Sequence, residues 1–396
     1  MKDTIAQSEK LFELYENLPG ASEEIEEEPA LDPRTGKPLE KVFGASQWQL
    51  MWRKFIRNKA AVAGGVVILI FYLGALFADF LAPGTLTTRY TKYIYMRPQM
   101  VHFFNEGKFQ PFVYDLQQEF DESLRRFYTL DPEKKTVIKF FAKGDPYKLF
   151  GLIPTDLHLY QGEEGRPVAL LGTDHQGRDV FSRILIGSQI SLTISLVGVF
   201  FSLTLGTVLG LVSGYYGGRV DNIIQRVIEL IRSFPSVPLW MALSAVIPMS
   251  WSVVQTYLAI TLILSLIGWT WLARQLRGKV LALRNEDFVT AAKLAGASDR
   301  WIIFRHLVPA TLGHIIVIST LSMPSLILAE TSLSYLGLGL RPPVTSWGVL
   351  IQESQNYQSL ALYPWVFTPA AAIALCILAF SYLGDGLRDA VDPYTV

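Results

Sequence analysis

The stretch 190–212, ISLTISLVGVFFSLTLGTVLGLV, contains no charged residue. A helix needs about 20 residues to cross a hydrocarbon core of about 30 Å. The backbone of a segment in lipid must satisfy its own hydrogen bonds, and apolar runs of this length do so as helices. Five more apolar runs of similar length occur at 60–82, 224–246, 253–272, 310–328 and 364–383. The sequence therefore predicts an all-α membrane protein with six transmembrane helices.

The run 224–246 is the least regular of the six. Arg226 and Arg232 lie in its first turns, and Pro235 and Pro238 interrupt it. Proline removes a backbone donor and bends or breaks a helix. We expect the first half of this run to lie near the membrane surface or against partner helices, with a kink at the prolines.

The composition also indicates a membrane protein. Half of the chain (50%) is hydrophobic, only 18% is charged, and the mean hydropathy is +0.29. A net charge of zero argues against a nucleic-acid partner, because a nucleic-acid-binding protein needs a surplus of lysine and arginine. The single cysteine, Cys376, can form neither an intrachain disulfide nor a cysteine-based metal site. The acidic stretch 23–28 is unlike a cleaved signal peptide, so we expect residues 1–45 to form a flexible cytoplasmic tail.

Lysine and arginine are concentrated before the first run and between the fourth and fifth runs. The segments after the third and fifth runs hold almost none. The basic residues are Arg53, Lys54, Arg57 and Lys59 before the first run, and Arg274, Arg277, Lys279, Arg284, Lys293, Arg300 and Arg305 between the later two. Because cytoplasmic loops are enriched in these residues, we expect both termini and the loop 274–309 to be cytoplasmic.

This topology divides the chain into further regions. Residues 46–82 are expected to hold an interfacial helix and the first transmembrane helix, 189–383 the core helices, and 384–396 a cytoplasmic C-terminus. Residues 83–188 form one extracytoplasmic insertion, whose mixture of aromatic and charged residues predicts a small folded unit of mixed secondary structure. We expect a helix around 116–128 in it. A cap that packs on the helices or on partners is favoured over a dedicated ligand site.

The loop between the fourth and fifth runs contains EDFVTAAKLAGASDRWIIFRHLVP at 286–309. Glu286 and Asp287 are suited to the N-terminus of a short helix, and Gly296 is suited to its end. A second amphipathic stretch returns the chain to the membrane at Pro309. Small residues permit close approach, so such an exposed helix suits docking into a groove of another protein. The alternative is an ordinary amphipathic loop at the membrane surface.

The spacing of Thr290-Ala291-Ala292, Gly296 and Pro309 resembles the cytoplasmic EAA loop of ABC importer permeases. In that family the loop forms the coupling helix that sits in a cleft of the ATPase. Thr290 replaces the usual leading glutamate, and Glu286 or Asp287 is the nearby acid that can supply the charge. The residues that the resemblance assigns to ATPase coupling are Glu286, Asp287, Thr290, Ala291, Ala292, Gly296, Ala297 and Pro309.

Four further stretches are similar to the C-type subunit of dipeptide and oligopeptide permeases, which belong to the peptide/nickel transport family. They are WRKFIRNK at 52–59, LGTD with GRDV at 171–180, GYYGG at 214–218 and GDGLRD at 384–389. The resemblance implies the ABC type I importer permease fold in the plasma (inner) membrane of a prokaryote. It implies a non-catalytic subunit without a cofactor. The implied partners are a homologous B-type permease, two ABC ATPase subunits and an extracytoplasmic substrate-binding protein.

The energy source and the cargo follow from the same resemblance. The chain has no phosphate-binding loop of the Gly, four residues, Gly-Lys-Ser/Thr type, so ATP must be hydrolysed on partner chains. Di- or oligopeptides are the expected cargo, and oligosaccharides or nickel complexes are the alternatives. An ion-coupled secondary transporter would need buried carboxylates or interrupted helices in repeated halves. A membrane receptor or enzyme would need a catalytic constellation in the insertion, and neither pattern is clear.

Two ionisable residues bracket the fifth run, and such groups inside a bilayer are functional candidates. His314 and Glu330 are therefore candidates for the translocation path, although Glu330 could snorkel and His314 could bond a backbone carbonyl. Asp174, His175 and Asp179 lie close together in the insertion. We favour caps of backbone N–H groups at turns for these aspartates over metal ligation, and we expect no metal.

Overall fold

The computed structural model describes residues 47–122, 125–163, 165–342 and 344–391. The chain divides into two compact units, Met1–Leu50 and Met51–Val396, and the spanning helices and all described strands belong to the second. The tail expected at 1–45 lies outside the described residues. The first described helix, α2 (Gln47–Arg57), carries Lys54 and Arg57 in its last turn.

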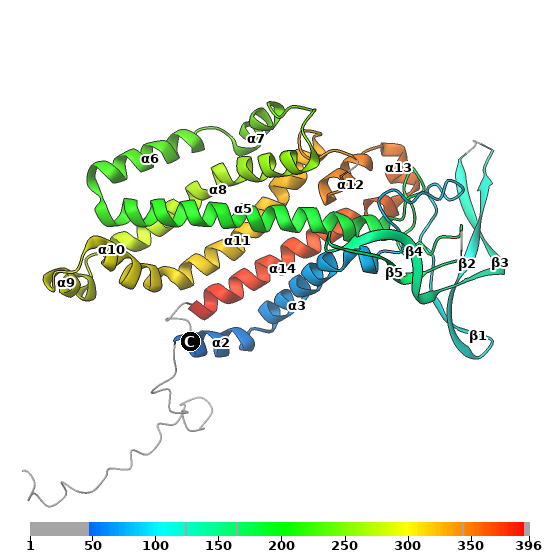
Figure 1. Cartoon of the computed structure of the whole chain (residues 1–396), viewed down its shortest axis with the longest axis horizontal. Coiled ribbons are helices and arrows are strands. Elements are labelled where there is room, and N and C mark those ends of the chain that lie inside the picture. Colours follow the sequence, from blue (N-terminus) through cyan, green and yellow to red (C-terminus); the bar gives the residue numbers. More distant parts are fainter. Residues whose placement is uncertain (1–46, 123–124, 164, 343, 392–396) are drawn as a thin grey trace, which may run out of the picture. The chain divides into compact units, whose positions relative to one another are not determined.

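Five helical segments of the described chain are long and apolar enough to cross a membrane. They are α3 (Lys59–Leu76), α5 (Val180–Tyr216), α8 (Val253–Leu283), Asp299–Tyr335 and Pro364–Val391. The fourth joins α10 (Asp299–Ile302), the π-helical turn η1 (Ile303–Leu307) and α11 (Val308–Tyr335), and the fifth joins the 3-10 turn η2 (Pro364–Phe367) and α14 (Thr368–Val391). The short helices α12 (Trp347–Glu353) and α13 (Tyr357–Leu362) follow α11 and precede α14 in the chain, and they lie at the end of the bundle nearer the strands (Figure 1). Five of the six predicted runs are thus confirmed as candidate spans.

The remaining run, 224–246, is divided between two helices. α6 (Gly218–Arg232) ends before Ser233, and α7 (Ser236–Ala245) has only 10 residues. Pro235 between them is extended, with ψ of 131°. Proline has no N–H and disfavours a helical conformation at the residue before it, so the helix stops there. The kink expected at the prolines is a break, and the count of six spanning helices is not confirmed.

The region between α4 (Ala78–Leu81) and α5 is built from strands. β1 (His102–Asn105), β2 (Lys108–Phe120) and β3 (Arg126–Val137) form one antiparallel sheet, and β4 (Lys139–Leu149) and β5 (Ile153–Gln161) form a hairpin. The strands lie at one end of the helical bundle (Figure 1).

The helix predicted around 116–128 is therefore wrong. Leu116 lies on β2 and is paired with Leu130, and Tyr128 lies on β3 and is paired with Gln118. Leu116 and Tyr128 both pack with Met96 in a buried cluster. Aromatic and branched side chains favour strands when cross-strand neighbours cover them, and the sequence pattern alone did not reveal that pairing.

The most extensive helix contact of the bundle joins α5 to α8. Gly206, Gly210 and Gly214 stand one helical turn apart on α5. A Cβ atom at Gly210 would lie 2.8 Å from the carbonyl oxygen of Ala273, and one at Gly214 would lie 2.7 Å from Cβ of Val280. Small residues at this spacing let two helix backbones approach closely, which gives van der Waals contact where lipid offers no hydrophobic driving force.

We predict that Gly210→Ala destabilises the chain by about 1–3 kcal/mol, because the added methyl group forces α8 away from α5. Thermal unfolding of the purified chain in detergent measures the effect. Gly278→Ala on α8 is the matched control, because nothing lies within 4 Å of the added Cβ there. An equal midpoint for the two variants would contradict this account of the contact.

Candidate functional site

The helix α9 (Asp287–Leu294) in the loop between α8 and α10 ends in a defined cap. Gly296 adopts a left-handed conformation with φ of +81°. The N–H of Ala297 donates to the carbonyl of Ala292 (3.0 Å), and the N–H of Gly296 donates to the carbonyl of Lys293 (3.0 Å). These are the two hydrogen bonds of a Schellman motif, in which glycine avoids the strain of positive φ. The predicted end of the helix at Gly296 is confirmed.

The other end of α9 carries the two expected acids. Glu286 is the N-cap residue, and its carbonyl accepts hydrogen bonds from the N–H groups of Val289 (3.0 Å) and Thr290 (3.1 Å). Its side chain makes no capping hydrogen bond. Asp287 follows in the first turn, and both carboxylates are exposed to solvent. Negative charge at this end complements the helix dipole.

One face of α9 is fixed to the bundle. Val289 is fully buried and packs in one cluster with Leu276 of α8, Ile302 of α10 and Leu307 of η1. The partly buried side chains of Ala292 and Ala297 pack against the same cluster. Burial of an aliphatic side chain of this size stabilises by about 1.5–3 kcal/mol, so the loop has its own apolar anchor.

The opposite face of the loop is exposed and apolar. Leu294 is 85% exposed, Phe304 73% and Phe288 40%. Thr290 and Ala291 are exposed beside them. Apolar side chains gathered on a charged loop are typical of a surface that contacts another protein or a membrane.

Polar contacts connect the loop to the end of α5. The hydroxyl of Tyr215 donates to Asp299 (2.7 Å), and Nζ of Lys293 lies 5.3 Å from the centre of the Tyr215 ring. Nearby, Arg277 donates from Nε (2.6 Å) and Nη2 (2.5 Å) to the two carboxylate oxygens of Asp221. The Arg277 hydrogen bonds hold the pKa of Asp221 below its ordinary value, although burial acts in the other direction. The ends of α5, α6, α8 and α10 are therefore held together.

Pro309, the last residue assigned to the loop, lies exposed in the first turn of α11. It follows η1, whose His306 ring contacts the rings of Trp301 (4.9 Å) and Phe288 (5.9 Å). π-helical turns are uncommon and often occur at functional positions. The structure thus brings the predicted loop residues together at the end of the bundle away from the strands (Figure 1).

A second polar cluster lies at the opposite end of the bundle. Oδ2 of Asp174 accepts hydrogen bonds from Nε of Arg178 (2.7 Å) and Nη1 of Arg183 (2.7 Å). Oε2 of Glu353 accepts from Nη2 of Arg178 (2.7 Å) and Nη1 of Arg183 (2.6 Å). All four side chains are largely buried. Two buried positive charges are therefore matched by two buried negative charges between α5 and α12.

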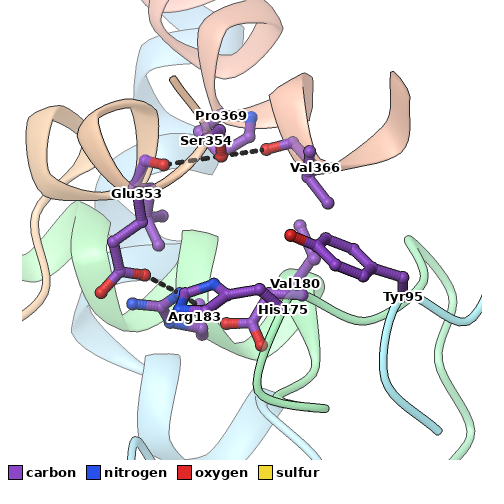
Figure 2. Close-up of a pocket in the computed structure, with 10 residues that line it drawn as sticks. Tyr95, His175, Val180, Arg183, Glu353, Ser354, Val366 and Pro369 are labelled. Atoms are coloured by element: carbon purple, nitrogen blue, oxygen red, sulfur yellow. Dashed lines mark hydrogen bonds and ion pairs between the residues drawn. The ribbon is translucent and has the colours of Figure 1, made fainter. Parts of the chain in front are cut away.

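This cluster borders a pocket, and Arg183, Glu353 and Tyr95 are among the residues that line it. Figure 2 shows the ion pair of Arg183 and Glu353 on one side of the pocket and Tyr95 on the other. Ligand atoms of Asp174, His175 and Glu353 lie within 4.8 Å of one another. Burial raises the pKa of Asp174, but the two arginines outweigh this and hold it below its ordinary value. Both carboxylates are thus already paired with guanidinium groups rather than arranged for a cation.

The aspartates also cap backbone groups, as predicted. Asp174 accepts hydrogen bonds from the N–H groups of Gln176 (2.7 Å) and Arg178 (3.0 Å), and Asp179 accepts from the N–H of Ser182 (2.7 Å) at the start of α5. Such side-chain caps satisfy the donors that a turn or helix end leaves unpaired.

The two candidate residues for the path occupy different environments on α11. Glu330 is fully buried and accepts hydrogen bonds from Ser191 (3.0 Å) and Ser334 (2.8 Å). His314 is partly buried. They stand 16 positions apart, which corresponds to about 24 Å of helix, so the structure does not bring the two together.

Sequence reasoning did not single out Arg183, Glu353 or Leu294. Glu353 lies far along the chain from its partners, so no local pattern predicts the pairing. The sequence does contain a pattern that could have identified Leu294. Apolar residues recur at a spacing of three at Phe288, Ala291 and Leu294, on the side of α9 that Val289 does not occupy.

Comparison with known proteins gives two family matches. Residues 206–395 match the family described as binding-protein-dependent transport system inner membrane component, and residues 46–98 match the N-terminal TM domain of oligopeptide transport permease C.

Individual relatives agree with these matches. The oligopeptide transport system permease protein OppC of Haemophilus influenzae is 40% identical over 56% of this chain and 69% of its own length. The dipeptide transport system permease protein DppC of Lactococcus lactis subsp. cremoris is 32% identical over 88% of this chain and 91% of its own length. The glutathione transport system permease protein GsiD of Pectobacterium atrosepticum is 31% identical over 87% and 91%. A solved chain of the MetNI methionine ABC transporter aligns with 53% of this chain and 96% of its own length, at 18% identity and a TM-score of 0.43.

We predict that Gly296→Ala loosens the end of α9 by about 1–2 kcal/mol, because only the backbone conformation is strained and no atom lies near the added Cβ. Hydrogen exchange at the amide of Ala297 measures this opening. Gly296→Asn is the matched control, since asparagine tolerates positive φ better. Unchanged protection in the alanine variant would contradict the role of the cap.

We predict that Glu353→Gln destabilises the chain by about 3–5 kcal/mol, because Arg178 and Arg183 then share a single buried carboxylate. Thermal unfolding is the measurement. The exposed pair of Lys143 and Asp156 supplies the control, because Lys143→Gln should change stability by less than about 1 kcal/mol. Similar losses in the two variants would show that the cluster does not lock α12 to α5.

Proposed function

Because this chain belongs to the family of binding-protein-dependent transport system inner membrane components and is a permease subunit of an ABC importer, we propose that its cargo is a di- or oligopeptide. The support is that relatives similar over most of their length are named for oligopeptide, dipeptide and glutathione transport. These three cargoes are all short peptides. Oligosaccharides and nickel complexes are the competing cargoes.

The loop around α9 is proposed to be the coupling element that docks into an ATPase subunit. The observation that carries this proposal is the contrast between its two faces: Val289 is fully buried in the bundle, whereas Leu294 on the other side is 85% exposed. A rigidly anchored helix with an exposed apolar face can transmit a displacement of the partner to the membrane helices. Thr290 and Ala291 would lie at the contact, and Glu286 would supply the acid at the helix start.

The remaining parts of the machine are proposed from the same family membership. A second homologous permease of the B type, two ATPase subunits and an extracytoplasmic binding protein would complete the importer. ATP binding by the ATPase pair would favour one of two conformations of the permeases through contacts that differ between the two states. The permease fold would be that of type I importers, with both termini and the α9 loop on the cytoplasmic side of a prokaryotic plasma membrane. His314 and Glu330 are the candidate residues of the path.

The test is ATPase activity of the co-purified complex in liposomes, with its binding protein and a mixed peptide pool. We expect peptides to stimulate hydrolysis. Stimulation by oligosaccharides or nickel chelates instead would overturn the peptide cargo while keeping the importer.

For the docking surface we predict that Leu294→Asp lowers the amount of co-purified ATPase or its stimulation by about 30-fold, the effect of losing about 2 kcal/mol at the centre of an interface. Met100→Asp is the control, because Met100 is similarly exposed (81%) and lies outside the α9 loop. Normal co-purification of the ATPase and normal stimulation of its activity in the Leu294→Asp variant would contradict the assignment of α9 as the coupling helix.

A further inference from the structure

The hairpin of β4 and β5 ends in an apolar turn, the hairpin tip (residues 149–153). Leu152 is 82% exposed, Ile153 56% and Phe150 47%. The turn is closed by the N–H of Gly151, which donates to the carbonyl of Lys148 (2.9 Å). Three large apolar side chains are thus exposed within four residues, and such a patch is typical of a surface that contacts a partner.

The base of this hairpin is fixed to the segment that follows the first spanning helix. Nδ1 of His158 lies 2.6 Å from the carbonyl oxygen of Ala82, and its Nε2 lies 2.9 Å from that of Asp145. Nε2 of Gln161 donates to the carbonyl of Pro83 (2.5 Å). Ala82 and Pro83 directly follow α4, so the base sits where the chain leaves the bundle.

The tip returns towards the spanning part of α3. The ring of Phe150 lies edge-on to the ring of Phe77 at 5.6 Å, and Phe77 is the C-cap residue of α3. Between His158 and Phe150 the hairpin therefore follows the chain backwards from Ala82 to Phe77. The tip of the hairpin therefore lies towards the candidate span α3 rather than away from it.

The tip continues an apolar surface that α3 already presents. The exposed side chains of this helix include Leu69, Leu73 and Leu76, and the surface passes through Phe77 to the tip. α3 is one of the candidate spans, and only 22% of its apolar window is buried inside the chain. Lys148 is exposed next to the tip. Aromatic side chains beside a lysine are typical of the boundary between lipid and water.

We propose that the hairpin tip inserts into the interfacial layer of the bilayer at the C-terminal end of α3, so that the hairpin is a lipid anchor. Its partner is a lipid surface, which takes up Leu152, Ile153 and Phe150 while Lys148 faces the headgroups. The proposal goes beyond the transport function, because it depends neither on the cargo nor on ATPase docking.

The test is a spin label at Leu152→Cys in the full chain reconstituted into liposomes, with collision rates measured for oxygen and for a water-soluble nickel chelate. The native Cys376 is fully buried, so the unmodified chain reports the background labelling. Leu69→Cys on α3 is the lipid control. Lys108→Cys, exposed at the β1–β2 turn, is the water control.

We expect the ratio of oxygen to nickel collisions at Leu152 to shift from the value at Lys108 towards the value at Leu69. A ratio equal to that at Lys108 would place the tip in water and overturn the proposal. Protection of the label from both reagents would also overturn it, because the tip would then be covered by protein. Leu149→Cys, a half-buried site of the same turn, repeats the measurement if the Leu152 variant does not fold.

Discussion

The close packing of α5 against α8 is the contact on which the rest of the bundle depends. Gly210 brings the two backbones together, and no side chain larger than hydrogen fits there without movement. α5 runs for 37 residues, so its two ends reach both polar clusters. Arg183 near its start is held by Asp174 and Glu353, and Tyr215 near its end is held by Asp299. The helix α5 thus connects the end of the bundle beside the strands to the end that carries the α9 loop.

Much of this arrangement could be predicted because lipid restricts the backbone so strongly. Five spans could be predicted from the length of the apolar runs alone. The end of α9 at Gly296 could be predicted because a helix often ends at a residue with positive φ, which glycine adopts without strain. The sequence predicted a kink at Pro235, and the structure has a break there. Proline allows either outcome, and the surrounding structure determines which one occurs. The prediction of a helix at 116–128 was wrong because the residues that pair with this segment, such as Leu130 with Leu116, come from a different part of the chain. The pairing of Glu353 with Arg183 also joins distant residues, and no local pattern encodes it.

Two buried carboxylates of the bundle, Glu330 and Glu353, are stabilised in the same way. Glu330 is surrounded by serine hydroxyls, and Glu353 is matched by two arginines, so each buried carboxylate has several donors. An unpaired carboxylate in this setting would cost several kcal/mol. The α9 loop differs, since Glu286 and Asp287 remain exposed. This difference separates groups that fix the bundle from groups that can meet a partner.

The continuous helix from Asp299 to Tyr335 has a mechanical consequence. At a rise of 1.5 Å for each of its 37 residues it is about 55 Å long. A tilt of about 5° at the loop end would displace the far end by about 5 Å, if the helix stayed straight. Two positions depart from a regular α-helix, the π turn at Ile303–Leu307 and the interior Pro324, which lacks a backbone donor. A tilt that starts at the loop end would reach Glu330 only after it had passed both of these positions.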